Sequence, residues 1–204
     1  MKFIKLLTIL ALAALIGCSE ESSDNNSLGK LNINDVVQFI PKNDYMNNST
    51  LIFKNAQGLE KSFTISTSSN ELNKVFGEKT YKAENLEINL IDPNTDEYRL
   101  NINVGSNYTT STESVSYISC GLLNDTNDGL VPVIDMVLEN SRLNSHTIHA
   151  ELVLNNKSFT DVHQSIDLSS QVNGFSNLYY NSEFGIIGFT DELNELWVFE
   201  KYEN

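Results

Sequence analysis

Three histidines lie close together in the sequence and have the side chains that bind metal ions most often. His146 and His149 are three positions apart, and His163 follows two residues after Asp161 in the next β-rich segment. Residues three apart on a β-strand point to opposite faces, so the rings of His146 and His149 should diverge, while His163 or Asp161 could join one of them. A zinc site needs three or four converging ligands. Solvent-exposed strand residues are therefore expected here, and no metal site.

Residues 124–129, with the sequence NDTNDG, have the polar spacing of a calcium-binding loop, and Asp135 stands at its far end. Asn124 occupies the first ligand position, where Asp is usual, and Asp135 is shorter than the customary bidentate Glu. The flanking segments have the pattern of strands, not of helices. A polar hairpin turn is favoured, and weak Ca²⁺ binding at this turn remains the alternative.

Motifs of the common enzyme classes are missing from the sequence. It contains no Gly-x-Ser-x-Gly, no His-Glu-x-x-His and no phosphate-binding glycine loop. Cys120 lies in an apolar segment with no base identifiable near it, which is typical of a buried thiol. The 27 acidic residues are too many to single out a hydrolytic pair. We expect a protein that is not an enzyme and uses no cofactor.

Four aromatic residues are candidates for ligand binding: Tyr98, Tyr179, Tyr180 and Trp197. Exposed rings of this kind could stack on the sugar rings of a glycan. The segment around Trp197 is apolar on both faces, however, which is typical of a central strand and predicts that Trp197 is buried. A glycan platform and a set of core rings are thus the two alternatives.

The strongest chemical signal lies at the N-terminal end. Two lysines precede an apolar run, residues 6–16, that is too short to span a bilayer and has the form of an export signal. The order Leu-Ile-Gly-Cys at residues 15–18 then resembles the site of lipoprotein signal peptidase, which cuts before a diacylglycerol-modified cysteine. Cleavage between Gly17 and Cys18 is predicted to remove residues 1–17 and to leave acyl chains, such as palmitate, on Cys18.

The residues that follow Cys18 are polar and acidic, and they predict a flexible tether over residues 18–30. Ser19 is not the Asp that retains many lipoproteins in the inner membrane. The acidic start of the tether also resembles the export signal that sends lipoproteins of Bacteroidota to the cell surface. The expected location is the outer membrane, with a lipid anchor, on the periplasmic face or the cell surface.

The net charge restricts the partners. Removal of the signal peptide takes away two lysines and no acid, so the formal charge changes from −14 to −16. Such a surface repels nucleic acid and is not attracted to anionic lipids. Membrane attachment must then come from the acyl chains, since two or three chains anchor a protein stably. A glycan, a lipid or an envelope protein remains a candidate partner.

Alternating apolar and polar residues predict a single β-rich domain over residues 31–204. The period of two is clearest in residues 86–90 and 98–104, which predict an antiparallel pair. Turn residues at 55–58 and 155–156 predict further hairpins. About ten short strands are expected in all, as an antiparallel β-sandwich or a strongly curved sheet.

Short helices are expected, at most, near residues 33–40 and 68–76. The first would be stopped by Pro41 and the second closed by Gly77.

The C-terminal region also carries a recognisable order of residues. Paired tyrosines are followed by Gly-Ile-Ile-Gly-Phe at residues 185–189 and then by Trp197. This order resembles the C-terminal strands of small surface lipoproteins of Bacteroidota, and residues 53–58 fit their opening hairpin. The resemblance covers a small part of the chain and implies no known activity.

These patterns predict a membrane-anchored lipoprotein that serves as a non-enzymatic envelope or interaction module. The alternative is a ligand-binding lipoprotein, which would take a glycan through its aromatic residues or a lipid in an apolar groove.

Overall fold

The computed structural model describes residues 27–33, 40, 49–94, 99–124, 129–137, 146–165, 175–191 and 193–204. Every regular element in these residues is a β-strand, which confirms the predicted all-β class. The strands are β1 (Ser27–Leu31), β2 (Thr50–Lys54), β3 (Glu60–Phe76), β4 (Lys79–Ile91), β5 (Arg99–Tyr108), β6 (Ser114–Asn124), β7 (Gly129–Val137), β8 (His146–Leu154), β9 (Lys157–Ser165), β10 (Phe175–Asn181), β11 (Gly185–Asp191) and β12 (Leu196–Glu203).

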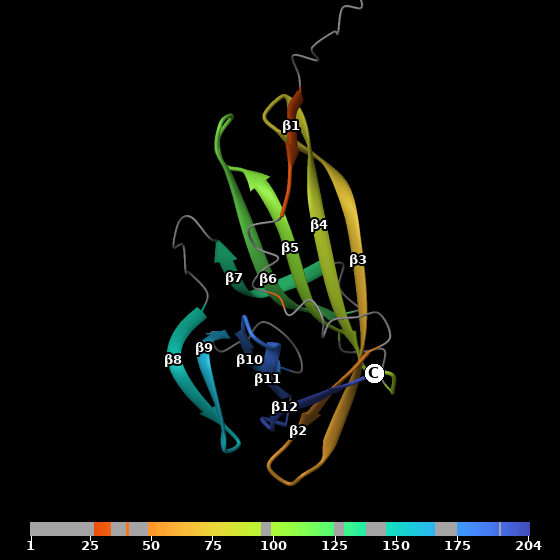
Figure 1. Cartoon of the computed structure of the whole chain (residues 1–204), viewed down its shortest axis with the longest axis vertical. Helices are drawn as coiled ribbons and strands as arrows, with labels where there is room; N and C mark the ends of the chain where they lie inside the picture. Colours follow the sequence, from red (N-terminus) through yellow and green to blue (C-terminus); the bar gives the residue numbers. More distant parts are fainter. Residues whose placement is uncertain are drawn as a thin grey trace, which may run out of the picture.

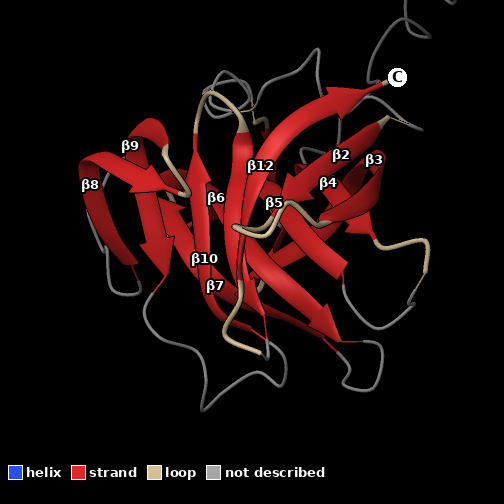
Figure 2. Ribbon diagram, turned by 90° about the horizontal axis from the view of Figure 1, so that it is seen from below, coloured by secondary structure: helices blue, strands red, loops and turns tan. Residues whose placement is uncertain are grey.

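The strands form one sheet in the order β7-β6-β5-β4-β3-β2-β12-β11-β10-β9-β8, in which every neighbouring pair is antiparallel. β1 lies off this path and pairs in parallel with β4. The sheet is strongly curved, because β7 at one end contacts β8 and β9 at the other (Figure 1, Figure 2). β7 and β8 share no ladder in the described residues, so the sheet stays open. Of the two predicted architectures, the structure is the curved sheet.

The core follows from the alternation of apolar residues in the strands. Leu90 pairs with Leu100, and Ile88 with Ile102, so these four side chains lie on one face and are fully or almost fully buried. The polar residues between them occupy the other face. The predicted antiparallel pair is therefore confirmed.

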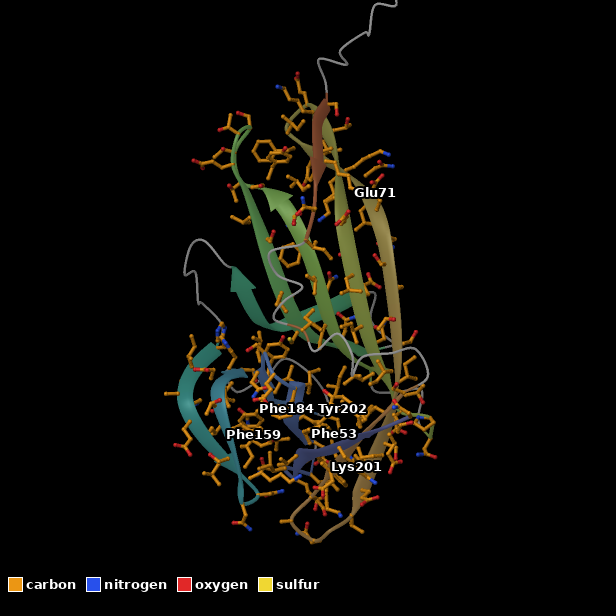
Figure 3. The ribbon with its side chains drawn as sticks, viewed as in Figure 1. Phe53, Glu71, Phe159, Phe184, Lys201 and Tyr202 are labelled. Atoms are coloured by element: carbon orange, nitrogen blue, oxygen red, sulfur yellow. The ribbon has the colours of Figure 1, made fainter. Side chains whose placement is uncertain are left out.

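Aromatic rings fill the core where β2, β3 and β11 meet. The ring of Phe53 lies 5.6 Å from that of Phe63 and 5.1 Å from that of Phe189, with the planes close to perpendicular. Edge-to-face contacts of this kind add to the stabilisation that comes from burial. Phe53 lies in the lower half of the molecule, in the same region as Phe159, Phe184 and Tyr202 (Figure 3).

The tight turns follow the chemistry of their residues. Asn155 and Asn156 both have positive φ, 44° and 67°, as the two central residues of a type I′ turn require, and asparagine is favoured at both places. The predicted hairpins at residues 155–156 and 55–58 are both confirmed, as the turns between β8 and β9 and between β2 and β3.

The helix predicted near residues 68–76 is wrong. These residues continue β3 as an unbroken strand, and each is paired with a residue of β4 up to Phe76 and Lys79. Gly77, with φ 61°, belongs to the two-residue turn between the strands and does not close a helix. The long ladder with β4 outweighs the weak local capping signal. The other predicted helix, near residues 33–40, lies outside the described residues except at Ile33 and Ile40.

The predicted tether also extends too far. Residues 27–30 belong to β1, which pairs with Thr80 to Ala83 of β4, so the last four residues of the predicted tether are part of the sheet. The hydroxyl of Tyr108 in β5 donates a 2.8 Å hydrogen bond to the carbonyl of Leu28. This strand is short, but it is held on both sides.

β3 and β4 project beyond the core as a long hairpin, and we call residues 66–86 of this hairpin the arm (Figure 1). β1 lies along the arm and begins near its tip, because Ser27 pairs with Thr80. Salt bridges cross the arm from Lys30 to Glu71 and Glu84, and from Lys82 to Glu71, over 2.8–3.2 Å. These groups are exposed, so the pairs contribute little stability and mainly make the surface of the arm polar.

Candidate functional site

The structure describes only part of the predicted sites. Gly17, Cys18 and Tyr98 lie outside the described residues, as do residues 125–128 of the calcium-like loop. The ends of that loop are described, and Asn124 pairs with Gly129 as the predicted hairpin requires.

The other three candidate aromatic residues are in the core. Tyr179, Tyr180 and Trp197 are 9%, 1% and 4% exposed, so none of them offers an open ring face to a sugar. Of the two alternatives, the structure shows core rings and not an exposed platform for these three residues. β12 lies between β2 and β11, and this central position confirms the prediction that Trp197 is buried.

His146 and His149 diverge, as the strand spacing predicts, but all three histidines are partly buried and not fully solvent-exposed as expected, and His146 pairs with His163. Nε2 of His146 lies 2.9 Å from Nδ1 of His163, and His149 faces the other side of β8, where its Nε2 lies 2.9 Å from Oε1 of Gln164. The ring of His163 also packs against that of Tyr180, its neighbour across β9 and β10. A hydrogen bond between two imidazoles needs an N–H on one ring and a lone pair on the other. The two rings therefore cannot both be in the charged form, in which every ring nitrogen carries a proton.

His163 is poorly suited to carry a charge. Burial, with the neighbouring His146 as a second cause, lowers its pKa from 6.5 to about 4, although Asp161 acts in the opposite direction. Among the described residues, no three His, Cys, Asp or Glu side chains lie close enough together to hold a metal ion. The histidine pair thus acts as a neutral contact between β8 and β9.

Acid should weaken the fold through this pair. The pKa of His163 is lower in the folded chain than in the unfolded chain, so its contribution is complete above about pH 6.5 and is lost as the pH falls toward 4. We expect the free energy of unfolding to drop by about 1–3 kcal/mol from this residue, less than the full shift implies because the ring is partly exposed. Urea denaturation at a series of pH values measures the effect.

The variant His163→Gln should lose this part of the pH dependence. His149→Gln is the matched control, because His149 contacts a neutral amide on the opposite face of the strand. Equal pH dependence in wild type and His163→Gln would show that the pair does not carry the effect.

Cys120 is fully buried, as predicted, on the face of β6 between Ile102 of β5 and Ile134 of β7. It is close enough to Tyr180 for the two groups to interact electrostatically, and burial is the main reason why the pKa of Tyr180 is well above its ordinary value. The Tyr180 hydroxyl therefore stays protonated in these surroundings. This side of the core is therefore suited to packing and not to proton transfer.

Asp191 forms a polar junction that the sequence did not indicate. Its Oδ1 accepts hydrogen bonds from the backbone N–H groups of Leu193 and Glu195, both at 3.1 Å. Its Oδ2 accepts from Nζ of Lys61 at 3.0 Å and from Nε1 of Trp197 at 2.8 Å. Burial alone would raise the pKa of Asp191, but these hydrogen bonds outweigh it and keep that pKa below its ordinary value.

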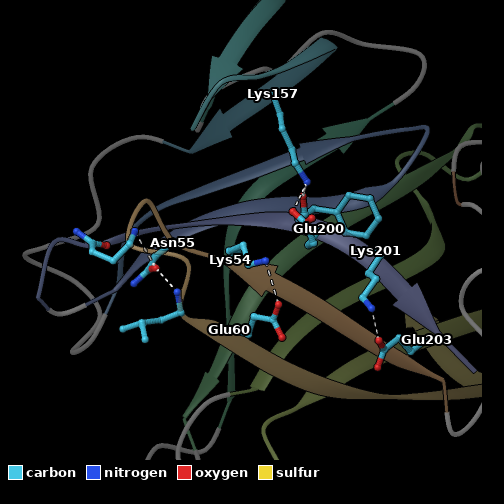
Figure 4. Close-up of polar contacts among 10 residues, drawn as sticks. Lys54, Asn55, Glu60, Lys157, Glu200, Lys201 and Glu203 are labelled. Carbon is cyan, nitrogen blue, oxygen red and sulfur yellow. Dashed lines mark hydrogen bonds and ion pairs between the residues drawn. The ribbon is translucent and has the colours of Figure 1, made fainter.

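Asn55 forms a turn with the same hydrogen bonds. Its Oδ1 accepts from the backbone of Gln57 and Leu59, and its Nδ2 donates to Oε1 of Glu195 at 2.7 Å (Figure 4). The two turns therefore lie side by side and are joined by a hydrogen bond. The two turns share a spacing in the sequence, in which Phe is followed by Asn or Asp two residues later and by Gly or Asn after three more, but this spacing does not indicate the contacts of Asp191 with Lys61 and Trp197.

The edges of the sheet differ in their protection. β7 carries Pro132 and a register shift against β6, two features that hinder further strand pairing. In the arm, Lys30 of β1 and Lys82 of β4 form salt bridges with Glu71 of β3, so charged side chains cover one face of the strands. β8 has neither proline nor lysine, and Ile148 and Val153 are 49% and 62% exposed. No described strand pairs with the outer edge of β8.

No described segment forms a helix with the length and apolar character needed to cross a membrane. No protein-family model, curated protein or solved structure matches this chain.

Proposed function

We propose that the chain is a lipid-anchored lipoprotein of the outer membrane and acts as a non-enzymatic interaction module. The sequence supports the anchor through the order Leu-Ile-Gly-Cys behind an export signal, and the acidic residues after Cys18 support outer-membrane or surface delivery.

One observation carries the proposal of an interaction module. Only residues 19–26 separate Cys18 from β1, and β1 begins at the tip of the arm, away from the aromatic core (Figure 1, Figure 3). Eight extended residues span about 30 Å at most. A lipid on Cys18 would hold the arm tip near the membrane and let the opposite end of the molecule project from it. Such an arrangement presents sheet edges and turns to a partner.

The polar groups of the described core support a non-enzymatic role. The four hydrogen bonds to Asp191 join it to its own turn, to β12 and to β3, and the histidine pair joins β8 to β9. A catalytic group needs a protonation state matched to its task and access to a substrate. Both oxygens of Asp191 already accept hydrogen bonds from the protein, and the ring of His163 faces that of His146. The structural use of these groups favours a binding role.

Lipidation of Cys18 can be tested directly. In a bacterial host that processes lipoproteins, the full chain should incorporate labelled palmitate and fractionate with the outer membrane. Cys18→Ala should accumulate as an unprocessed precursor without label. Cys120→Ala is the matched control and should keep both label and processing, because Cys120 is buried in the core. Label on Cys18→Ala, or none on the wild type, would refute the anchor.

Surface delivery is tested on the same cells. Protease added to intact cells should digest the wild-type protein if it faces outward and leave it whole if it faces the periplasm. A soluble, unlabelled wild-type protein would contradict the whole proposal.

A further inference from the structure

The outer edge of β8, residues 146–154, is suited to pairing with another strand. It offers nine residues in extended conformation, and it lacks the proline and register shift of β7 as well as the lysines and salt bridges of the arm. Long edges without such protection are templates for strand addition. Exposed Ile148 and Val153 would bury apolar surface if this edge were covered.

The charge of β8 favours a second copy of the same chain as the partner. The whole chain carries a formal charge of −14, so two copies repel each other over most of their surface. β8 holds a single acidic residue, Glu151, beside two histidines. This edge is therefore a place where two acidic molecules can approach with little repulsion.

The sequence of β8 is also complementary to itself. In an antiparallel pair of two β8 strands centred on Ala150, Ile148 of each copy lies opposite Leu152 of the other, on one face. On the other face, Thr147 lies opposite Val153, and His149 lies opposite the carboxylate of Glu151. Each contact occurs twice, as a twofold axis requires. Apolar residues meet apolar or β-branched ones, and an imidazole meets an acid.

We propose that β8 pairs with β8 of a second copy, antiparallel about Ala150, so that the two sheets join into one. This inference goes beyond the proposed function and does not require the lipid, although anchoring in one membrane would raise the effective concentration of the two copies.

Disulfide cross-linking of the full chain in isolated membranes tests the register. In this pairing the two Ala150 residues face each other with Cα atoms about 4.5–5.5 Å apart, within the range of a disulfide. Oxidation of the Ala150→Cys variant should therefore give a covalent dimer on a non-reducing gel. The parent chain, whose only cysteines are Cys18 and Cys120, gives the background. Because Cys120 is buried, a dimer of the parent chain would come from Cys18 without its lipid, so a failure of lipidation is seen separately from a failure of this pairing.

Two further variants fix the geometry. Val153→Cys alone should give no dimer above background, because the two positions would lie about 20 Å apart along the strands. The double variant Thr147→Cys with Val153→Cys should restore the dimer, since these residues face each other across the axis. Adding Ile148→Lys to Ala150→Cys places two lysines at the paired edges and should cause loss of the dimer band.

The proposal is overturned if Ala150→Cys gives no more dimer than the parent chain. It is also overturned if Ala150→Cys and Val153→Cys give equal amounts, which would indicate random collision. All of these substitutions except Ile148→Lys replace exposed side chains by a small one, so the fold should persist, and the native circular dichroism spectrum of each variant verifies this.

Discussion

Replacing Phe53 with alanine should lower the free energy of unfolding by about 3–5 kcal/mol. Phe53 is fully buried, and its ring contacts Phe63 of β3 and Phe189 of β11 edge to face. The variant would lose both contacts and leave a cavity at the middle of the strand order. Urea denaturation, followed through the fluorescence of the only tryptophan, Trp197, reports the change at the same core.

Leu59→Ala is the control for this prediction. Leu59 is 60% exposed in the turn between β2 and β3, so its truncation should change the free energy of unfolding by less than about 0.5 kcal/mol. Similar losses for Phe53→Ala and Leu59→Ala would mean that the aromatic cluster is not the centre of the core.

Asp191→Ala should lower the free energy of unfolding by about 2–4 kcal/mol. The change removes the acceptor for the buried indole N–H of Trp197 and the carboxylate that neutralises Lys61. It also removes the acceptor for two backbone N–H groups of the turn between β11 and β12. The ammonium group of Lys61 would keep its contact with the ring of Trp197, 4.2 Å from the ring centre, which limits the loss.

Asp191→Asn separates the charge from the hydrogen bonds of the turn. An amide oxygen can still accept from the backbone of Leu193 and Glu195, while the amide NH2 group replaces the oxygen that accepted from Lys61 and Trp197. We expect a smaller loss than for alanine, measured by the same urea denaturation. If both variants unfold like the wild type, the junction does not hold the turn.

The strands were predictable where one face is apolar and the other polar. Residues 86–90 and 98–104 alternate cleanly, and their register follows from burying one face. Residues 68–76 do not alternate cleanly, because both faces of the arm are polar or exposed there. Without a clear alternation, the local turn and capping residues favoured a helix in the prediction. The pairing with β4, which makes this segment a strand, could not be predicted from the sequence.

The candidate site was harder to predict, because it depends on contacts between distant segments. The histidine pair could be expected, since β8 and β9 are joined by a two-residue turn and their register follows from it. The junction at Asp191 could not, since Lys61 and Trp197 are separated by most of the chain. The burial of Tyr179 and Tyr180 likewise depends on how far the sheet curves around them.

The parallel pairing of β1 with β4 has a mechanical consequence. The chain enters β1 at the arm tip and runs along β4 toward the core. A pull on Ser27 directed away from the molecule therefore acts along the strand axis, in shear. Under this load the hydrogen bonds of the β1–β4 ladder share the force, whereas in peeling they would break one after another. The short first strand is thus placed to transmit tension from the N-terminal side into the whole length of the arm.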